Sequence, residues 1–587
     1  MRRCAVIFLL ATHLPAAATQ HWTVGGTEHP WSVWGVSEAV DAAAEFGWIQ
    51  PIRTTPDQNL ALGNEQRVTR AYSLQPSIQS LGGVESMVDG DSTTAFEMTL
   101  EATVGSSVIL DLGAVFPVHL VRFYPRQDEL HHERFLRAYQ VYVTDRTLSP
   151  EGQILWDLVA PNWENDDSIV NISIPNQYVR DVRIQAVTNL QWEVAEWEVY
   201  GQGFAPVATY TTEPIDLGGP ANFGALTWAA EHDPAGTVTL ATRTGTDSSP
   251  FTYYRLVRPE EGVVDTVEVT RSAYEALGEA DRWLSFDAVN WSYWSAPYAP
   301  SGREEIVSPA PRRYLQVQLQ FRSTAFTDRA KVDSVTIEYS SPPVAQRVIA
   351  EVSPGLVEAG KLTTFTYAVT PTIRPGDTGF DALTVQTPLA ARVRELRVAG
   401  VPQEFQAEVT DQAFTVRFPL VRTDGARLEL TFDAQVLIYG TLFSGTVFDS
   451  RGQDLPQEVV EGDASAELST NRLSVGLLEL GEEVLAGVAV DPAVFSPNGD
   501  GVNDRVAIGY DLKKLLLPGR VTLAVYTVNG ARVWSRSTLQ ASGSYAEEWD
   551  GRDAHGRLVA PGSYVCLLTV DTASGSEAKA RVVRVAY

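Results

Sequence analysis

The sequence near the C-terminus reads VTLAVYTVNGARVWS at residues 521–535. Apolar residues recur at every second position before the pair Asn529-Gly530, and the alternation resumes after it. Alternation with a period of two predicts a strand with one buried face, and Asn-Gly is a preferred pair in tight hairpin turns. These residues therefore predict a β-hairpin.

The same alternation recurs throughout the chain, and Gly, Pro, Asn and Asp separate the runs. Further examples stand at residues 108–112, 139–144, 238–242 and 335–339. Helical periodicity is rare, and only 37–46 and 272–283 predict short helices. Many short strands with frequent turn signals are typical of β-sandwiches. The expected fold class is all-β, a string of jelly-roll and immunoglobulin-like sandwiches.

The chain has 587 residues, which is too long for one hydrophobic core, and roughly four domains are expected. Boundaries are predicted at joints containing Pro, Gly and Ser. The predicted parts are a signal peptide at 1–18, a leader at 19–67, a first sandwich at 68–204, a second at 205–343, a third at 344–471, a linker at 472–487 and a last sandwich at 488–587.

The N-terminus has the pattern of a secretory signal peptide. Arg2 and Arg3 precede an apolar run that begins at Cys4, and Ala16-Ala17-Ala18 offers small residues for cleavage. The run is shorter than a membrane span needs, and no other segment is long and apolar enough to span. We expect a secreted, extracellular or outer-surface protein, with the periplasm as the other possibility. Cleavage leaves Cys566 alone, which excludes an intramolecular disulfide in the mature chain.

The charge balance excludes some classes of partner. The formal net charge is −28, with 45 Lys and Arg against 73 Asp and Glu. A nucleic-acid-binding protein shows the opposite balance, and an anionic membrane would repel this surface. An acidic exported protein suits calcium, which takes oxygen ligands. The alternative is that the excess of carboxylates only confers solubility.

An ordered set of motifs marks residues 68–204. The motifs are VDGDSTTAF at 88–96, SVILDLG at 107–113, VRFYPR at 121–126, YQVYV at 139–143 and AEWEVYG at 195–201. This order resembles the discoidin, or coagulation-factor C-type, family of galactose-binding-like jelly rolls. The resemblance implies a jelly roll whose ligand-binding loops lie at one end. It also implies a structural calcium site on the matching residues Asp89, Asp91, Thr94 and Glu196, although such Asp residues also cap the backbone of plain turns.

Five residues near these loops are candidate ligand contacts, with a glycan or another cell-surface or matrix polymer as the expected partner. A sugar needs an apolar face and fixed polar groups. Phe96 and Trp192 are candidates for the apolar face, and Arg126, His132 and Asn189 for the hydrogen bonds. The alternative is that both aromatic residues belong to the core and the charged loop is a solvated rim. The pair His131-His132 lacks a third ligand at sensible spacing for a transition metal.

The middle of the chain carries one conspicuous motif, WSYWS at residues 291–295. It spells the WSxWS motif of cytokine-receptor modules, but the paired cysteines of those modules are absent. We interpret its aromatic residues as packing against a second jelly-roll-like sandwich, with a carbohydrate platform as the less favoured role. Residues 344–471 read as an immunoglobulin-like spacer without a site.

The last module opens with FSPNGDGVND at 495–504 and continues with the hairpin, WDGRD at 549–553 and APGSY at 560–564. This set resembles the immunoglobulin-like domain of the flagellar hook-capping protein and is similar to the sorting domains of type IX secretion. The resemblance implies a C-terminal attachment or secretion signal, with a plain end-cap as the alternative. Asn498, Asp500, Asn503 and Asp504 are either a second calcium site or turn residues.

The sequence contains no nucleophile elbow, zinc-protease motif, phosphate loop or dinucleotide fingerprint. The expected function is a secreted or cell-surface, non-catalytic binding protein that uses the discoidin-like module for carbohydrate binding or adhesion. The first alternative is a structural extracellular scaffold or appendage component. The least favoured is a glycan-active enzyme, whose carboxylate pair leaves no local signature.

Overall fold

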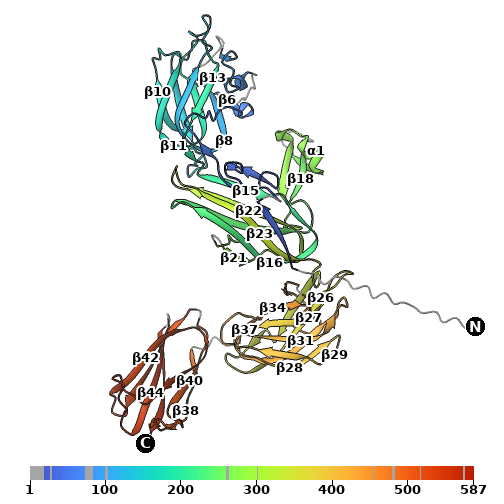
Figure 1. The fold of residues 1–587 in the computed structure, drawn as a ribbon, viewed down its shortest axis with the longest axis vertical. Coiled ribbons are helices and arrows are strands. Elements are labelled where there is room, and N and C mark those ends of the chain that lie inside the picture. Colours follow the sequence, from blue (N-terminus) through green and yellow to red (C-terminus); the bar gives the residue numbers. More distant parts are fainter. Residues whose placement is uncertain are drawn as a thin grey trace, which may run out of the picture. The chain divides into compact units, whose positions relative to one another are not determined.

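The computed structural model describes residues 19–26, 29–72, 83–98, 104–258, 264–299, 302–452, 454–478, 483–515, 517–572 and 575–587. The predicted signal peptide at 1–18 lies outside this part. The described chain is all-β, as predicted, and its strands form several sandwiches (Figure 1). None of its helices is long and apolar enough to cross a membrane. The described residues divide into two compact units, one within 20–219 and 223–339, and the other within 220–222 and 340–587 together with Thr19.

The discoidin-like sandwich has a main sheet in the order β10-β9-β11-β8-β13, and β6 also pairs with β8. Its strands are β6 (Val68–Tyr72), β8 (Ser106–Tyr124), β9 (Tyr139–Thr144), β10 (Asp157–Asn162), β11 (Val170–Ala186) and β13 (Glu196–Tyr200). Alternate residues of β9, namely Tyr139, Val141 and Val143, are buried in the core. The strands β7 (Phe96–Met98) and β12 (Trp192–Val194) form a separate two-stranded ribbon. This ribbon joins the predicted metal turn to the closing strand.

The second sandwich takes both of its sheet edges from the segment predicted as a leader. The strand β1 (Gln20–Gly25) pairs with β23 (Ala330–Ser340), and β2 (Gly35–Glu38) pairs with β15 (Val207–Thr212). The sheet order is β1-β23-β16-β22-β15-β2, and β17 pairs with β22. The discoidin-like sandwich is therefore inserted between strands of the second sandwich. The remaining strands here are β16 (Ile215–His232), β17 (Gly236–Gly245), β21 (Gly302–Glu305) and β22 (Arg312–Ser323).

The helix predicted at 37–46 is wrong. Instead, β2 is followed by the short strand β3 (Val40–Asp41), which pairs with β4 (Gln50–Pro51). The Asp41 carboxylate accepts the backbone N–H groups of Ala43 and Ala44, which fixes a turn where the helix was expected. In place of the second predicted helix stand the short helix α1 (Arg271–Glu275) and a 3₁₀ turn at Glu279–Asp281, and the chain returns to strand at β20 (Arg282–Phe286). The central strand β18 (Phe251–Val257) pairs with both β19 (Asp265–Val269) and β20 in a small sheet, in the order β19-β18-β20.

The third module is a two-layered sandwich. One sheet holds β24 (Arg347–Ser353), β26 (Thr363–Thr372), β28 (Arg392–Val398), β29 (Val401–Pro402), β32 (Leu428–Ala434) and β36 (Val460–Glu461). The other holds β27 (Phe380–Gln386), β30 (Gln406–Val409), β31 (Ala413–Val421), β34 (Gly445–Phe448) and β35 (Gln457–Glu458). Between them lies a cluster of buried phenylalanine rings, with Phe432 5.0 Å from Phe414 and 5.8 Å from Phe443. This core agrees with the prediction of a β-sandwich at 344–471.

The last module packs two sheets around Trp549. One sheet has the strands β38 (Leu485–Asp491), β40 (Val506–Leu512) and β43 (Gly543–Trp549). The other has β39 (Val494–Phe495), β41 (Gly519–Thr527), β42 (Arg532–Gln540), β44 (Gly562–Thr572) and β45 (Gly575–Val585). The Trp549 ring lies 5.6 Å from Phe495 and 5.5 Å from Tyr564. Cys566 is buried beside them, and burial raises the pKa of its thiol to about 12.

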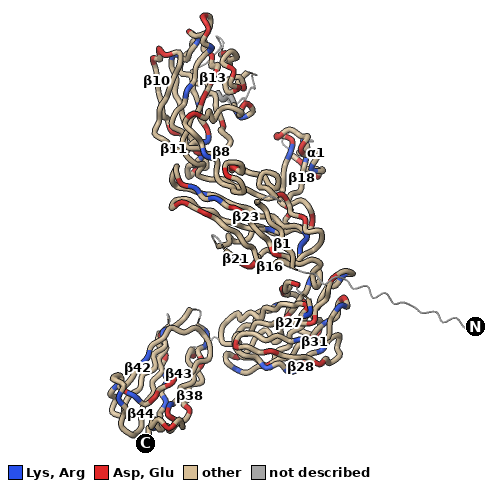
Figure 2. The backbone as a smooth tube through the Cα atoms, in the orientation of Figure 1, with Lys and Arg blue, Asp and Glu red and all other residues tan. Residues whose placement is uncertain are grey.

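The predicted hairpin is confirmed, as the pairing of β41 with β42. The tight turn expected for Asn-Gly needs a positive φ at both residues. Here only Gly530 of the pair Asn529-Gly530 has a positive φ, at 88°, so the turn is of another type. The register shifts between Val525 and Tyr526, as in hairpins with a type I turn and a bulge. Acidic residues occur on every module (Figure 2).

Candidate ligand and cation sites

The predicted metal turn follows the short helix at Val84–Met87 and leads into β7. The Thr94 hydroxyl donates to Asp89 Oδ2 at 2.8 Å, which ties the two ends of the turn together. The Asp91 carboxylate accepts the backbone N–H and the hydroxyl of Thr93 at 2.9 and 2.6 Å, and these bonds lower its pKa. Three of the four predicted ligands therefore belong to one hydrogen-bonded turn.

Glu196 approaches this turn from the start of β13. It is only 3% exposed, and its Oε1 atom has no hydrogen-bond partner among the described residues. Burial is the main reason that its pKa rises to about 7, and the charges of Asp89, Glu198 and Asp91 add to the effect. A buried carboxylate beside two others is costly unless a proton or a cation accompanies it. The chemistry of this donor set fits a hard cation, and calcium binding here stays a prediction.

A second polar group lies one residue pair further along the β7–β12 ribbon, where Glu193 stands opposite Glu97. The Glu193 side chain is fully buried. Its carboxylate accepts one hydrogen bond from the backbone N–H of Arg126 at 3.0 Å and two from the Arg126 guanidinium at 3.1 and 2.8 Å. Arg126 also donates to Glu97, and Arg134 lies 3.6 Å from Glu193. The Arg126 guanidinium is therefore held in one position at the rim of the module.

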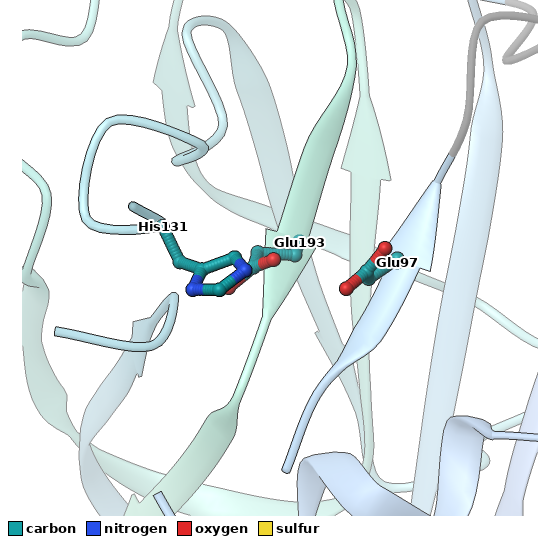
Figure 3. A group of neighbouring side chains, drawn as sticks. All are labelled: Glu97, His131 and Glu193. Carbon is teal, nitrogen blue, oxygen red and sulfur yellow. The ribbon is translucent and has the colours of Figure 1, made fainter. Parts of the chain in front are cut away.

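Figure 3 shows His131 pointing from its loop toward Glu193 and Glu97. One ligand atom from each of these residues lies within 4.8 Å of the other two. Within the described residues this is the one such group of three, and Asp89, Asp91 and Glu196 are not so closely gathered. Arg126 already supplies a cation to both carboxylates, and His131 Nδ1 lies 2.7 Å from Asp128. The two carboxylates are accordingly part of an ion-pair network centred on Arg126.

The two other predicted polar contacts are on the flanking loops. His132 is partly exposed, and its Nδ1 lies 3.0 Å from the carbonyl oxygen of Asp128. Asn189 is exposed on the loop between β11 and β12. Two apolar side chains, Leu130 and Leu190, are exposed on the same loops. Sequence reasoning did not single out Glu97, Glu193 or these leucines, because alternating strands and polar loops contain such residues everywhere.

The prediction that Phe96 and Trp192 form a stacking platform is wrong. Phe96 is 3% exposed and Trp192 is 2% exposed, and their rings meet edge to face with centroids 5.8 Å apart. A sugar stacks on an open ring face, and neither residue offers one. Both rings instead belong to the core beneath the β7–β12 ribbon, which was the alternative interpretation.

The second predicted calcium site lies in the loop after β39. Here Asp504 accepts the backbone N–H groups of Gly499 and Gly501 at 2.6 and 2.7 Å. Asp500 accepts Val502, and Asn498 accepts Asp500. Asn503 completes the turn with a positive φ of 52°. These contacts account for the side chains of Asn498, Asp500 and Asp504 as turn residues, and calcium binding here stays a prediction.

Comparisons with known proteins give one family match and several similar solved structures. Residues 489–584 match the family model of the CHU_C type IX secretion signal domain, which confirms the resemblance to sorting domains. No curated protein matches the chain.

Three carbohydrate-binding modules represent the similar structures. Chitosan-binding module 1 of a chitosanase/glucanase from Paenibacillus sp. IK-5 is 20% identical, with 24% of this chain and 99% of the module covered and a TM-score of 0.19. The family 32 module of Clostridium perfringens NanJ, in complex with galactose, is 17% identical over 25% of this chain and 99% of the module, with a TM-score of 0.19. A Streptococcus pneumoniae fucose-binding module is 18% identical over 25% of this chain and 96% of the module, with a TM-score of 0.19.

Proposed function

We propose that this chain is an exported carbohydrate-binding protein that holds its ligand at the loop end of the discoidin-like module. The observation that carries the proposal is the pairing of two features on one ribbon. At one end of the ribbon, Thr94 precedes β7 and Glu196 follows β12, next to the cross-strand pair Phe96–Val194. The next cross-strand pair is Glu97–Glu193, and here Glu193 holds Arg126 in place. The rigid polar group offers fixed hydrogen-bonding partners of the kind that orient a bound ligand, and the oxygen atoms of the neighbouring turn suit calcium.

The chemistry of the rim supports a glycan over other partners. Arg126 and His132 offer donors, Glu97 offers acceptors, and Leu130 and Leu190 offer apolar surface on the flanking loops. Sugars need both kinds of contact, because each ring has hydroxyl groups at its edge and an apolar face. The net charge of −28 argues against nucleic acid.

Calcium is the cofactor that suits the turn. Asp89, Asp91, Thr94 and Glu196 would hold it, with backbone carbonyl groups completing a shell of six to eight oxygens. When bound, the ion supplies the positive charge that the buried Glu196 carboxylate lacks. Its role in this proposal is structural, since it fixes the end of the ribbon on which Arg126 depends.

The C-terminal module is proposed to direct export and surface attachment. Support comes from the match of residues 489–584 to a type IX secretion signal domain. The scaffold alternative keeps the same export route but assigns the loops of the discoidin-like module to contacts with neighbouring chains.

The test is binding of the chain from residue 19 to 587 to a broad glycan array, with calcium and with chelator. We expect calcium-dependent binding that falls at least tenfold in Leu130→Ala and His132→Ala. Leu148→Ala is the matched control, because Leu148 is also exposed but lies on the loop after β9, whereas Leu130 lies on the loop before it. A folded chain that binds no glycan, or self-assembly unaffected by sugars, would overturn the proposal in favour of the scaffold. Turnover of a bound glycan would identify an enzyme.

A further inference from the structure

A separate cavity of about 660 Å³ lies in the second sandwich. Its floor is the outer face of β15 and β22, which presents hydroxyl and amide side chains, among them Thr209, Thr211, Gln316 and Gln318. Its walls come from residues 248–294, including Phe251, Phe286, Tyr293 and Trp294. Aromatic walls over a polar floor give the mixture of surfaces found in pockets for small polar ligands.

Arg243, on β17, is the charged residue that decides what this cavity accepts. It is 5% exposed and lines the cavity. Its guanidinium lies 4.4 Å from the Trp294 ring centroid and 5.3 Å from that of Phe286. Burial lowers its pKa to about 10, and no carboxylate contributes to that shift.

The hydrogen bonds of Arg243 are incomplete. Within the described residues, its one hydrogen bond runs from Nε to Gln316 Oε1 at 2.8 Å, and it has no ion pair there. The two terminal nitrogens are thus left without a protein acceptor, although a buried guanidinium normally pairs with an anion. The aromatic rings stabilise its charge only in part.

The acidic residues at the cavity do not meet this need. Glu38 lies 3.6 Å from Arg180, and Glu213 lies 4.0 Å from Arg271. Both therefore have other arginine partners, and an anion from outside the chain is the remaining partner for Arg243.

The motif WSYWS places the aromatic wall. Ser292 Oγ accepts the backbone N–H of Thr244, and Ser295 Oγ accepts that of Thr242, each at 3.1 Å. These bonds dock the segment along β17 on either side of Arg243. Tyr293, at the centre of the motif, is 75% exposed and lines the cavity.

We propose that this cavity binds a uronic acid unit of an acidic polysaccharide, with the sugar carboxylate on the terminal nitrogens of Arg243. The planar guanidinium matches a carboxylate in a two-pronged contact. The Tyr293 and Trp294 rings then face the sugar ring, and the Thr and Gln side chains of the floor serve its hydroxyl groups. Several such groups spread along a floor suit a sugar better than an acidic peptide. This site is independent of the one proposed in the discoidin-like module.

The test is calorimetric titration of the chain 19–587 with trimers of galacturonate, glucuronate and mannuronate, and with their neutral methyl esters. We expect at least one trimer to bind, and its ester to bind at least tenfold more weakly. Arg243→Gln and Tyr293→Ala should weaken binding by a similar factor. Because Arg243 is buried and its substitution endangers folding, the exposed Tyr293 supplies an independent variant.

Two controls separate this site from others. Arg313→Gln removes a surface arginine of the same sandwich, which pairs with Asp216 at 2.7 Å, and should leave binding unchanged. Leu130→Ala should also leave it unchanged, although it impairs the site proposed in the discoidin-like module. The inference is overturned if no uronate trimer binds, if the esters bind equally well, or if folded Tyr293→Ala binds like the parent. Equal binding of hexaglutamate would overturn the assignment to a sugar.

Discussion

At the scale of single residues, Glu196 is the residue on which the proposed calcium site depends most. Its carboxylate is buried next to Asp89 and Asp91, and its pKa is raised to about 7. Without a cation, the folded protein bears the cost of this charge at neutral pH. With a cation, the same charge becomes a source of affinity.

We therefore predict opposite effects of Glu196→Gln in the two conditions. In chelator at pH 8 the variant should be more stable than the parent by about 2 kcal/mol, because a neutral amide replaces a buried charge. Calcium should raise the Tm of the parent protein but not that of the variant, because the variant lacks the Glu196 carboxylate as a ligand. Thermal unfolding with calcium and with chelator measures both effects, and Glu151→Gln, exposed in the same module, is the control. A calcium response that persists in Glu196→Gln would exclude this residue as a ligand.

The sequence predicted the polar residues of this site better than its aromatic ones. The Asp-Gly-Asp turn is a local feature, so Thr94 does meet Asp89 as the motif implied. Whether Phe96 and Trp192 face solvent depends on which side of the β7–β12 ribbon lies over the core, and alternation alone does not distinguish the two sides. The contact of Arg126 with Glu193 spans 67 residues and has no local signal.

At the scale of elements, the hairpin of the last module depends on a single backbone conformation. Gly530 has a φ of 88°, in the left-handed region that a Cβ atom disfavours. We predict that Gly530→Ala lowers the free energy of unfolding by about 1–2 kcal/mol. Chemical denaturation of the chain 19–587 measures the change, and Asn529→Ala, the preceding residue with ordinary φ, should cost less. Equal losses for both variants would contradict this account of the turn.

The elements themselves show where local patterns suffice. Strands with clear alternation were predicted almost residue by residue, as at β9 (Tyr139–Thr144). The predicted helix at 37–46 was wrong because residues 35–38 pair with β15, and partners distant in sequence override a weak local preference. Within the WSYWS segment, Trp291 is buried, as the packing interpretation predicted, whereas Tyr293 is exposed. The buried Arg243 beside this segment has no local signal in the sequence, because its contact with Trp294 joins residues distant in the chain.

At the scale of the whole molecule, export and binding are predicted to reside in separable parts. In a bacterium that has type IX secretion, removal of residues 488–587 should leave the protein inside the cell envelope with its glycan binding intact. Fusion of residues 484–587 to a periplasmic reporter should carry a detectable fraction of it to the surface. Cell fractionation with surface proteolysis measures both. Surface display of the shortened chain would contradict a sorting role.

The long-range closure of the second sandwich bears on when it can fold. Of the strands in this sandwich, β1 is synthesised first and its partner β23 is synthesised last. The contact between Thr23 and Thr336 on these two strands spans 313 residues. Until β23 arrives, β1 is a strand without its neighbour, and such edges pair readily with other chains. Completion of this sheet thus marks the end of synthesis of the whole unit. A chain that ends before residue 330 therefore keeps β1 as an unpaired edge strand, which exposes incomplete chains to aggregation and proteolysis.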